Sequence, residues 1–174
     1  MEYRNNIKML IDEESIRSAI IKLGEKLNKE YADKEVYMIC VLKGAVVFAT
    51  ELAKTLTMPL KMEFIRLSSY GSGTSYSGKV NAVDIKLPDL NGKNVLIVED
   101  IIDTGHTAKF LLDFINHNFH MESLKFCSLL DKKARREVDI DADYYCFEVD
   151  DKFLVGYGLD YDGYYRNLPF IGYI

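Results

Sequence analysis

Two apolar runs, VYMICVL at 36–42 and VLIVED at 95–100, constrain the fold of this chain most strongly. A strand with one face in water alternates polar and apolar residues, so unbroken runs rich in Val and Ile predict strands buried on both faces. A helical pattern follows each run, over about 45–56 and 106–117. Strands alternating with helices predict an α/β fold with a right-handed, mostly parallel sheet and helices on both faces. Ligands of such sheets bind beyond the carboxyl ends of the strands, here at 43–44 and 100–107.

The remaining pattern adds further elements without an internal repeat or linker. Asp12 is placed to cap a helix over about 13–31, where Ile16, Ile20, Leu23 and Leu27 recur at helical spacing. Further strands are predicted at 60–69, 80–85, 123–130, 144–149 and 153–159, and Asn91 with Gly92 indicates a turn. The length of 174 residues fits one domain with a full hydrophobic core. We therefore expect a single domain over 1–174.

Composition narrows the classes of function. The net charge is −5, without a basic block, which weakens any proposal of nucleic-acid binding through a broad positive face. No apolar run approaches the roughly 18 residues that span a bilayer, and the first residues lack the order of a signal peptide. The three cysteines are odd in number and form no CxxC pair, which indicates buried, reduced thiols rather than a zinc site. We expect a cytoplasmic protein with no membrane partner.

The segment VLIVEDIIDTGHT at 95–107 carries most of the chemistry. Glu99 and Asp100 end a buried strand, and Asp103 opens a turn that leads through Thr104–Thr107 into a helix. Backbone N–H groups at such a turn can bind a phosphate, while carboxylates accept hydrogen bonds from the hydroxyls of a sugar. Two alternatives stay open at this point. The acids could be solvated residues beside a simple helix cap, or they could form an acidic metal pocket that accepts phosphoryl groups.

This segment closely resembles the phosphoribosyl-pyrophosphate motif of type I phosphoribosyltransferases, in the form of the hypoxanthine-guanine branch. The resemblance extends in order through VLKGA (41–45), RLSSYG (66–71), SLLDK (128–132) and DKFLVGYGLDYDGYYRNLP (151–169). It implies the type I phosphoribosyltransferase fold with a small hood, formed by about 131–174. It also implies purine salvage, in which phosphoribosyl pyrophosphate and hypoxanthine or guanine give IMP or GMP plus pyrophosphate, with Mg²⁺. Homodimers or homotetramers are typical of the family.

The resemblance also implies roles for residues on the phosphoribosyl side. Glu99 and Asp100 resemble the pair that holds the ribose hydroxyls and steadies Mg²⁺, and Asp103 resembles the general base that takes the purine proton. Residues 103–107, which are Asp103, Thr104, Gly105, His106 and Thr107, resemble the 5′-phosphate loop. His106 stands where relatives carry various residues, and it either adds a titratable positive charge or faces solvent. Lys43 and Gly44 resemble the pyrophosphate loop, in which the family often has a cis peptide, here Leu42–Lys43.

On the purine side, Lys132 resembles the lysine that donates to the 6-oxo group. Phe153 resembles the aromatic residue that stacks on the base, and the Leu154 backbone meets the edge of the base. Asp160 resembles a residue near the base that ligates a second Mg²⁺, and Arg166 resembles one that grips pyrophosphate. Lys133, Arg135 and Arg136 are interpreted as a solvated charge run.

The polar segment 70–79 is expected to be a mobile loop that closes over the reaction, with Ser69 and Tyr70 at its root. Two alternatives to an enzyme are a regulatory RNA-binding protein and a nucleotide-binding module without catalysis, both on the same fold. The acidic net charge counts against the first, and the presence of Asp103, Lys43 and Arg166 counts against the second. A dinucleotide-binding oxidoreductase is excluded because the chain has no GxGxxG motif.

Overall fold

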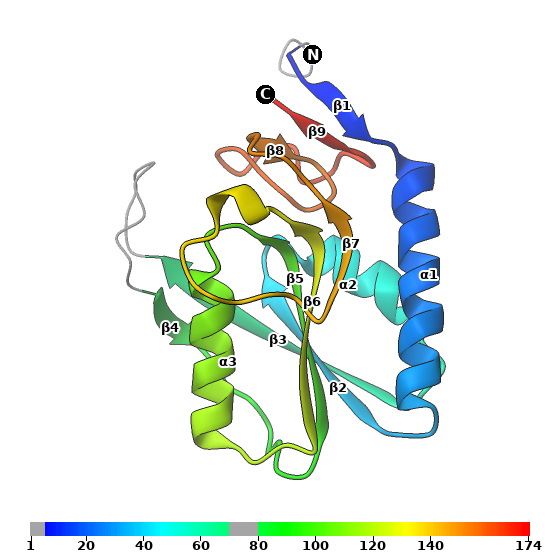
Figure 1. Cartoon of the computed structure of the whole chain (residues 1–174), viewed down its shortest axis with the longest axis vertical. Coiled ribbons are helices and arrows are strands. Elements are labelled where there is room, and N and C mark those ends of the chain that lie inside the picture. Colours follow the sequence, from blue (N-terminus) through cyan, green and yellow to red (C-terminus); the bar gives the residue numbers. More distant parts are fainter. Residues whose placement is uncertain (1–5, 70–79) are drawn as a thin grey trace.

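The computed structural model describes residues 6–69 and 80–174 (Figure 1). No helix in this part of the chain is long and apolar enough to cross a membrane. The elements are, in chain order, β1 (Lys8–Ile11), α1 (Glu13–Tyr31), β2 (Val36–Leu42), α2 (Val46–Ala53), β3 (Leu60–Ser69), β4 (Val80–Asp84), β5 (Asn94–Ile102), α3 (His106–Asn118), β6 (Ser123–Asp131), the 3₁₀ turn η2 (Lys133–Arg135), β7 (Tyr144–Glu148), β8 (Leu154–Val155) and β9 (Ile171–Tyr173).

A six-stranded sheet in the order β4-β3-β2-β5-β6-β7 forms the body of the described chain. The strands β3, β2, β5, β6 and β7 run parallel, and β4 pairs antiparallel with β3 at one edge. Both apolar runs of the sequence lie in the middle, because Val36 pairs with Asn94 of β5 and with Leu60 of β3. The predicted α/β fold with a mostly parallel sheet is confirmed.

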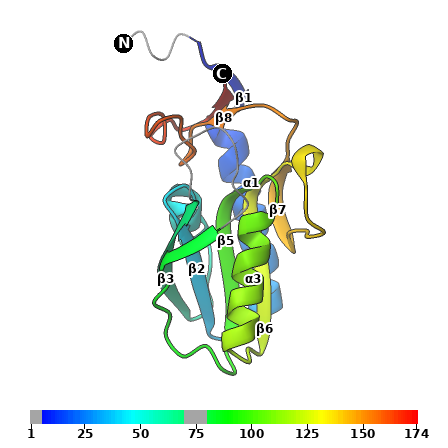
Figure 2. The same ribbon diagram turned by 90° about the vertical axis from the view of Figure 1, so that its left-hand side faces the viewer.

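Helices cover both faces of this sheet, as Figures 1 and 2 show, with α1 and α3 on opposite sides. Alternate residues of β2 point to opposite faces. Met38 belongs to the apolar cluster that contains Ile16 of α1, whereas Ile39 belongs to the cluster that contains Leu111 of α3. Burial on both faces is therefore the reason why these strands are apolar without alternation.

Helix α1 begins and ends where the sequence predicts. The Ser15 amide donates to the Asp12 carboxylate at 2.8 Å, which confirms the predicted cap. Helix α2 is shorter than the predicted 45–56 because it ends at Ala53. The side chain of Asn28 in α1 explains this end: its amide donates to the Thr55 carbonyl at 2.9 Å and its oxygen accepts from the Thr57 amide at 2.8 Å.

A three-stranded antiparallel sheet in the order β1-β9-β8 lies beyond one end of the large sheet (Figure 1). The segment 131–174, which was predicted as a hood, contributes to both sheets, since β7 pairs with β6 in the large sheet and β9 pairs with β1 in the small one. The strand predicted at 153–159 is also too long. It stops after Val155 because Gly156, Tyr157 and Gly158 have φ of 97°, 50° and 102°, which no strand adopts.

Candidate active site

The predicted site residues gather at the carboxyl ends of three neighbouring parallel strands. Lys43 follows β2, Glu99 lies in the last half of β5, and Lys132 follows β6. Ile102 of β5 pairs with Asp131 of β6, so the ends of these two strands are level. Figure 1 shows the small sheet facing this edge of the large one. Segments that lie far apart in the sequence therefore enclose one site.

The two acids of β5 are shielded from water to different degrees, since Glu99 is buried and Asp100 is partly exposed. Glu99 is only 6% exposed, and its burial, with the neighbouring Asp100 carboxylate, raises its pKa well above the ordinary value. Burial also raises the pKa of Asp100 to about 6, against the opposing effects of the Ile101 amide and the Arg166 guanidinium. Carboxylates kept in such an environment are typical of functional sites, because burial without a role would only destabilise the fold.

The loop between β8 and β9 brings Asp160 and Arg166 toward Asp100. Nη2 of Arg166 lies 2.5 Å from the Asp160 carboxylate, and Nη1 donates to the Gly158 carbonyl at 2.6 Å. The charge of Asp160 raises the pKa of Asp100, whereas Arg166 lowers it. The three charged groups therefore act on one another within one site.

Gly44 fits between this loop and the acids. A Cβ atom on Gly44 would collide with the Asp100 carboxylate, and a Cβ atom on Gly158 would collide with the Gly44 carbonyl. The Leu42–Lys43 peptide is cis, as the resemblance in sequence implied. The predicted pyrophosphate loop at Lys43 and Gly44 thus lies directly against the predicted ribose and pyrophosphate residues.

The predicted phosphate loop turns from β5 into α3. Gly105 has φ of 88°, which glycine adopts without strain, and it directly precedes the first residue of α3. Thr104 is 7% exposed, and its carbonyl accepts from the Glu137 amide at 3.0 Å. Nε2 of His106 lies 2.8 Å from the Glu137 carboxylate, so His106 has a partner within the protein. The backbone at a helix N-terminus offers N–H donors to an anion.

A cavity of about 260 Å³ adjoins this loop. It is smaller than the roughly 300–1,000 Å³ of sites for drug-sized ligands, so its size suits a single small ring system. Lys132, which is 5% exposed, donates to the Lys152 carbonyl at 2.9 Å and lies 3.7 Å from the Asp103 carboxylate. The cavity is lined by Ile101, Asp103, Lys132, Arg135, Asp151, Lys152, Phe153, Leu154 and Leu159.

The phosphoribosyl transferase domain family matches residues 6–162. The chain belongs to the phosphoribosyltransferase family. It is 44% identical over 165 residues to the hypoxanthine-guanine phosphoribosyltransferase of Streptococcus thermophilus, covering 95% of this chain and 91% of that protein. It is 45% identical over 165 residues to the hypoxanthine-guanine phosphoribosyltransferase of Streptococcus pneumoniae, again covering 95% of this chain and 91% of that protein.

Solved structures of phosphoribosyltransferases resemble the fold of this chain over nearly its whole length. A hypoxanthine phosphoribosyltransferase from Staphylococcus aureus superposes with a TM-score of 0.93 at 37% identity, covering all of this chain and 95% of that one. A hypoxanthine-guanine phosphoribosyltransferase from Bacillus anthracis superposes with a TM-score of 0.91 at 42% identity, covering 97% of this chain and 99% of that one. The type I phosphoribosyltransferase fold is thus confirmed.

Four other residues were predicted to contact the base or to support the lid. Phe153 is 54% exposed, and its ring meets that of Tyr161 edge-on at 5.4 Å between centroids. Leu154 is buried beside it. Ser69 is the last residue of β3, whereas Tyr70 and the predicted loop 70–79 lie outside the described residues.

The acids do not make a metal site by themselves. Within residues 6–69 and 80–174, no three side chains of His, Cys, Asp or Glu come together as metal ligands. Glu99, Asp100 and Asp160 therefore lack a complete ligand set. The mutual repulsion of Asp100 and Asp160 nonetheless fits a divalent cation, which would neutralise both, if a bound substrate supplied further oxygen ligands.

Sequence reasoning missed two parts of this phosphoribosyltransferase site. Arg135 and Asp151 line the cavity, and Nη1 of Arg135 lies 3.3 Å from the Asp103 carboxylate. The interpretation of Arg136 as a solvated charge was wrong, because its side chain is 13% exposed and makes contacts on every arm. Their position in the sequence could have indicated this role. Arg135 and Arg136 follow shortly after the end of a buried strand, at the edge of the sheet where ligands bind.

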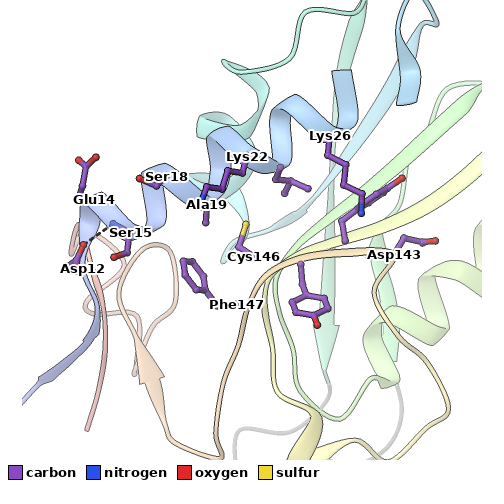
Figure 3. Close-up of a pocket in the computed structure, with 13 residues that line it drawn as sticks. Asp12, Glu14, Ser15, Ser18, Ala19, Lys22, Lys26, Asp143, Cys146 and Phe147 are labelled. Atoms are coloured by element: carbon purple, nitrogen blue, oxygen red, sulfur yellow. Dashed lines mark hydrogen bonds between the residues drawn. The ribbon is translucent and has the colours of Figure 1, made fainter. Parts of the chain in front are cut away.

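A larger hollow of about 1,020 Å³ lies between α1 and β7 (Figure 3). Figure 3 shows Lys22 and Lys26 of α1 on one side of it, with Cys146 and Phe147 of β7 on the other. None of the predicted site residues that the structure describes lines this hollow. Size alone therefore does not identify the site of chemistry in this fold.

Proposed function

We propose that this chain transfers the 5-phosphoribosyl group of phosphoribosyl pyrophosphate to hypoxanthine or guanine, giving IMP or GMP and pyrophosphate. The observation that carries the proposal is the 3.7 Å separation of Lys132 Nζ and the Asp103 carboxylate in a base-sized cavity. A 6-oxopurine requires two groups here. One is a cationic donor for the oxygen at C6, and the other is an acceptor for the proton at N7. The phosphate loop begins at the same Asp103.

Asp103 is the proposed general base. As purine N9 bonds to C1 of the sugar, the bond from C1 to the pyrophosphate oxygen breaks, and Asp103 accepts the proton from N7. Its Oδ1 atom is buried and has no hydrogen-bond partner among the described residues, so the carboxylate keeps an acceptor that no protein group uses. Its Oδ2 atom lies 3.7 Å from Nζ of Lys132 and 3.3 Å from Nη1 of Arg135, so two cations fix the orientation of the carboxylate.

Lys132 is the proposed reader of the base. An ammonium has three donors and no acceptor, and the Lys152 carbonyl takes one of the donors at 2.9 Å. The other donors suit the oxygen at purine C6, whereas the amino group of adenine would face them with a second donor. The exposed ring of Phe153 is available to stack on the base, and the backbone of Leu154 meets the edge of the base.

The remaining residues hold phosphoribosyl pyrophosphate in this proposal. Glu99 and Asp100 accept from the ribose hydroxyls, the loop 103–107 donates to the 5′-phosphate, and Lys43, Gly44 and Arg166 contact the pyrophosphate. Asp100 and Asp160 are the proposed protein contacts of Mg²⁺, together with Glu99. When bound, Mg²⁺ neutralises charge that develops on the departing pyrophosphate.

We assign the enzyme to purine salvage in the cytoplasm as a homodimer or homotetramer. Free cysteines at Cys40 and Cys127, both buried, fit a reducing compartment. Ser69 and Tyr70 are proposed to support a lid that keeps water from the reacting sugar.

The test is nucleotide formation from a panel of bases. The purified chain is incubated with phosphoribosyl pyrophosphate, Mg²⁺ and one base at a time, and nucleotides are identified by mass spectrometry. Hypoxanthine and guanine should give IMP and GMP, and adenine and uracil should give no nucleotide above background. Failure with both oxopurines would refute the proposal, and efficient use of adenine would refute the role of Lys132.

A further inference from the structure

An ion pair between Asp131 and Arg136 is buried behind the proposed site. The Asp131 side chain is 1% exposed and that of Arg136 is 13% exposed, and Nη2 of Arg136 contacts Oδ1 of Asp131. The second oxygen of Asp131 has no hydrogen-bond partner among the described residues, and Nζ of Lys133 lies 4.0 Å from it. This carboxylate therefore depends on Arg136 for its neutralisation.

The other arms of the Arg136 guanidinium bind backbone. Nε donates to the carbonyl of Asp103 at 3.2 Å, and Nη1 donates to the carbonyl of Ile140. One planar group thus joins the end of β6, the first residue of the phosphate loop and the segment 136–140. Only a guanidinium has donors in this fixed fork, since a lysine would offer one compact charge at one position.

The segment 136–140 continues this support along the phosphate loop. The Glu137 amide donates to the Thr104 carbonyl at 3.0 Å, and the Glu137 carboxylate lies 2.8 Å from Nε2 of His106. A Cβ atom on Gly105 would meet the side chains of Arg136, Val138 and Ile140 within 3 Å. Successive residues of the loop, from Asp103 to His106, therefore rest on the chain that Arg136 anchors.

The other partner of the pair adjoins the purine site. Asp131 precedes Lys132, and the Lys132 amide donates to the Ile102 carbonyl at 2.9 Å. Lys132, which we assign to the base, is therefore bonded to one partner of the ion pair. Asp103, which we assign to the proton of the base, is hydrogen-bonded through its carbonyl to the other partner. A change in the pair would alter the distance between Lys132 and Asp103.

We propose that Arg136 is a positioning residue of the transfer reaction, which fixes Asp103 relative to Lys132 through its pair with Asp131. The inference rests on the function proposed above. Replacing a buried ion pair by apolar residues of similar size is often neutral or stabilising, so stability alone does not require such a pair. A displacement of the reacting groups by about 1 Å can slow a reaction about 10²-fold. Holding Asp103 and Lys132 in place is therefore a reason to keep the pair.

The experiment compares single and double variants of the full chain. Arg136→Met leaves Asp131 unpaired, whereas Asp131→Leu with Arg136→Met replaces the pair by apolar side chains. Lys133→Met is the matched control, because Lys133 is 46% exposed, faces the same carboxylate at 4.0 Å and pairs with Glu148 at 2.9 Å. For each protein we would measure the melting temperature, kcat, and KM for hypoxanthine and for phosphoribosyl pyrophosphate.

The expected result separates stability from positioning. Arg136→Met should lower both the melting temperature and kcat, the latter about 10²-fold, while both KM values change far less. The double variant should regain the melting temperature but not kcat, and Lys133→Met should match the wild type.

Recovery of kcat together with the melting temperature in the double variant would overturn the inference and leave the pair a structural one. Full activity of Arg136→Met would also overturn it, although the proposed function would stand. A wild-type protein that forms no nucleotide would instead refute the proposed function.

Discussion

Replacing Asp100 with Asn should make the free protein more stable at neutral pH while impairing its proposed reaction. Asp100 is partly buried beside Glu99, and its removal from water raises its pKa to about 6 from the ordinary 3.8. A carboxyl group with a raised pKa in the folded state opposes folding once the unfolded chain ionises. The folded protein then either keeps a proton that solvent would remove or holds a charge away from water.

The size and sign follow from the two pKa values. Well below pH 3.8 the carboxyl is protonated in both states and has no effect, and the destabilisation grows as pH rises through 3.8 to about 6. Above pH 6 it is complete, and at about 1.4 kcal/mol per pH unit it is on the order of 2–3 kcal/mol. For a chain of this size, that corresponds to a gain in melting temperature of roughly 4–12 °C on removal of the charge.

The assay is thermal unfolding of wild type and Asp100→Asn at pH 4 and pH 7.5, in the presence of a chelator so that no cation binds the acids. We expect the variant to melt higher at pH 7.5, with a much smaller difference from the wild type at pH 4. Asp113→Asn is the control, since Asp113 is 66% exposed and pairs with Lys109 at the surface of α3. A variant that gains no stability at pH 7.5, or gains as much at pH 4, would show that the Asp100 carboxyl does not destabilise the fold.

Two further substitutions test individual roles. Asp103→Asn keeps the shape of the side chain but removes the proton acceptor, so turnover measured by nucleotide formation should fall roughly 10²–10⁴-fold, with substrate affinity changed much less; near-normal turnover would remove Asp103 from the chemistry. Lys132→Met removes a buried charged donor, worth about 1.5–3 kcal/mol, so the ratio of kcat/KM for hypoxanthine over adenine should fall about 10- to 150-fold. Lys133→Met should leave that ratio unchanged, and a ratio equally unchanged in Lys132→Met would place base selection elsewhere.

The large sheet and its helices were predictable from the sequence because local signals there agree with the tertiary packing. Asp12 and four apolar residues at helical spacing predict α1 to the residue, and unbroken apolar runs predict β2 and β5. The small sheet was not predictable in the same way. Strands β1 and β9 are four and three residues long and pair with each other across nearly the whole chain, so no local pattern identifies them.

In the candidate site, residues that lie close together in one segment were easier to predict than side-chain contacts between different segments. The spacing of Glu99, Asp100 and Asp103 follows from a single strand and turn, so the sequence places them together. The local sequence around Arg136 does not indicate whether its side chain is exposed to water or pairs with a buried carboxylate. Its role depends on Asp131 being 1% exposed at the end of β6, which requires the packing of the sheet.

The proposed transfer reaction is tested most directly by quantifying both of its products in one experiment. Hypoxanthine, Mg²⁺ and limiting phosphoribosyl pyrophosphate are mixed with the purified chain, and IMP and pyrophosphate are quantified in the same samples over time. Phosphoribosyl transfer predicts equal amounts of the two at every time point, and neither product without the base. Pyrophosphate released without an equal amount of IMP, or no release of either, would contradict it.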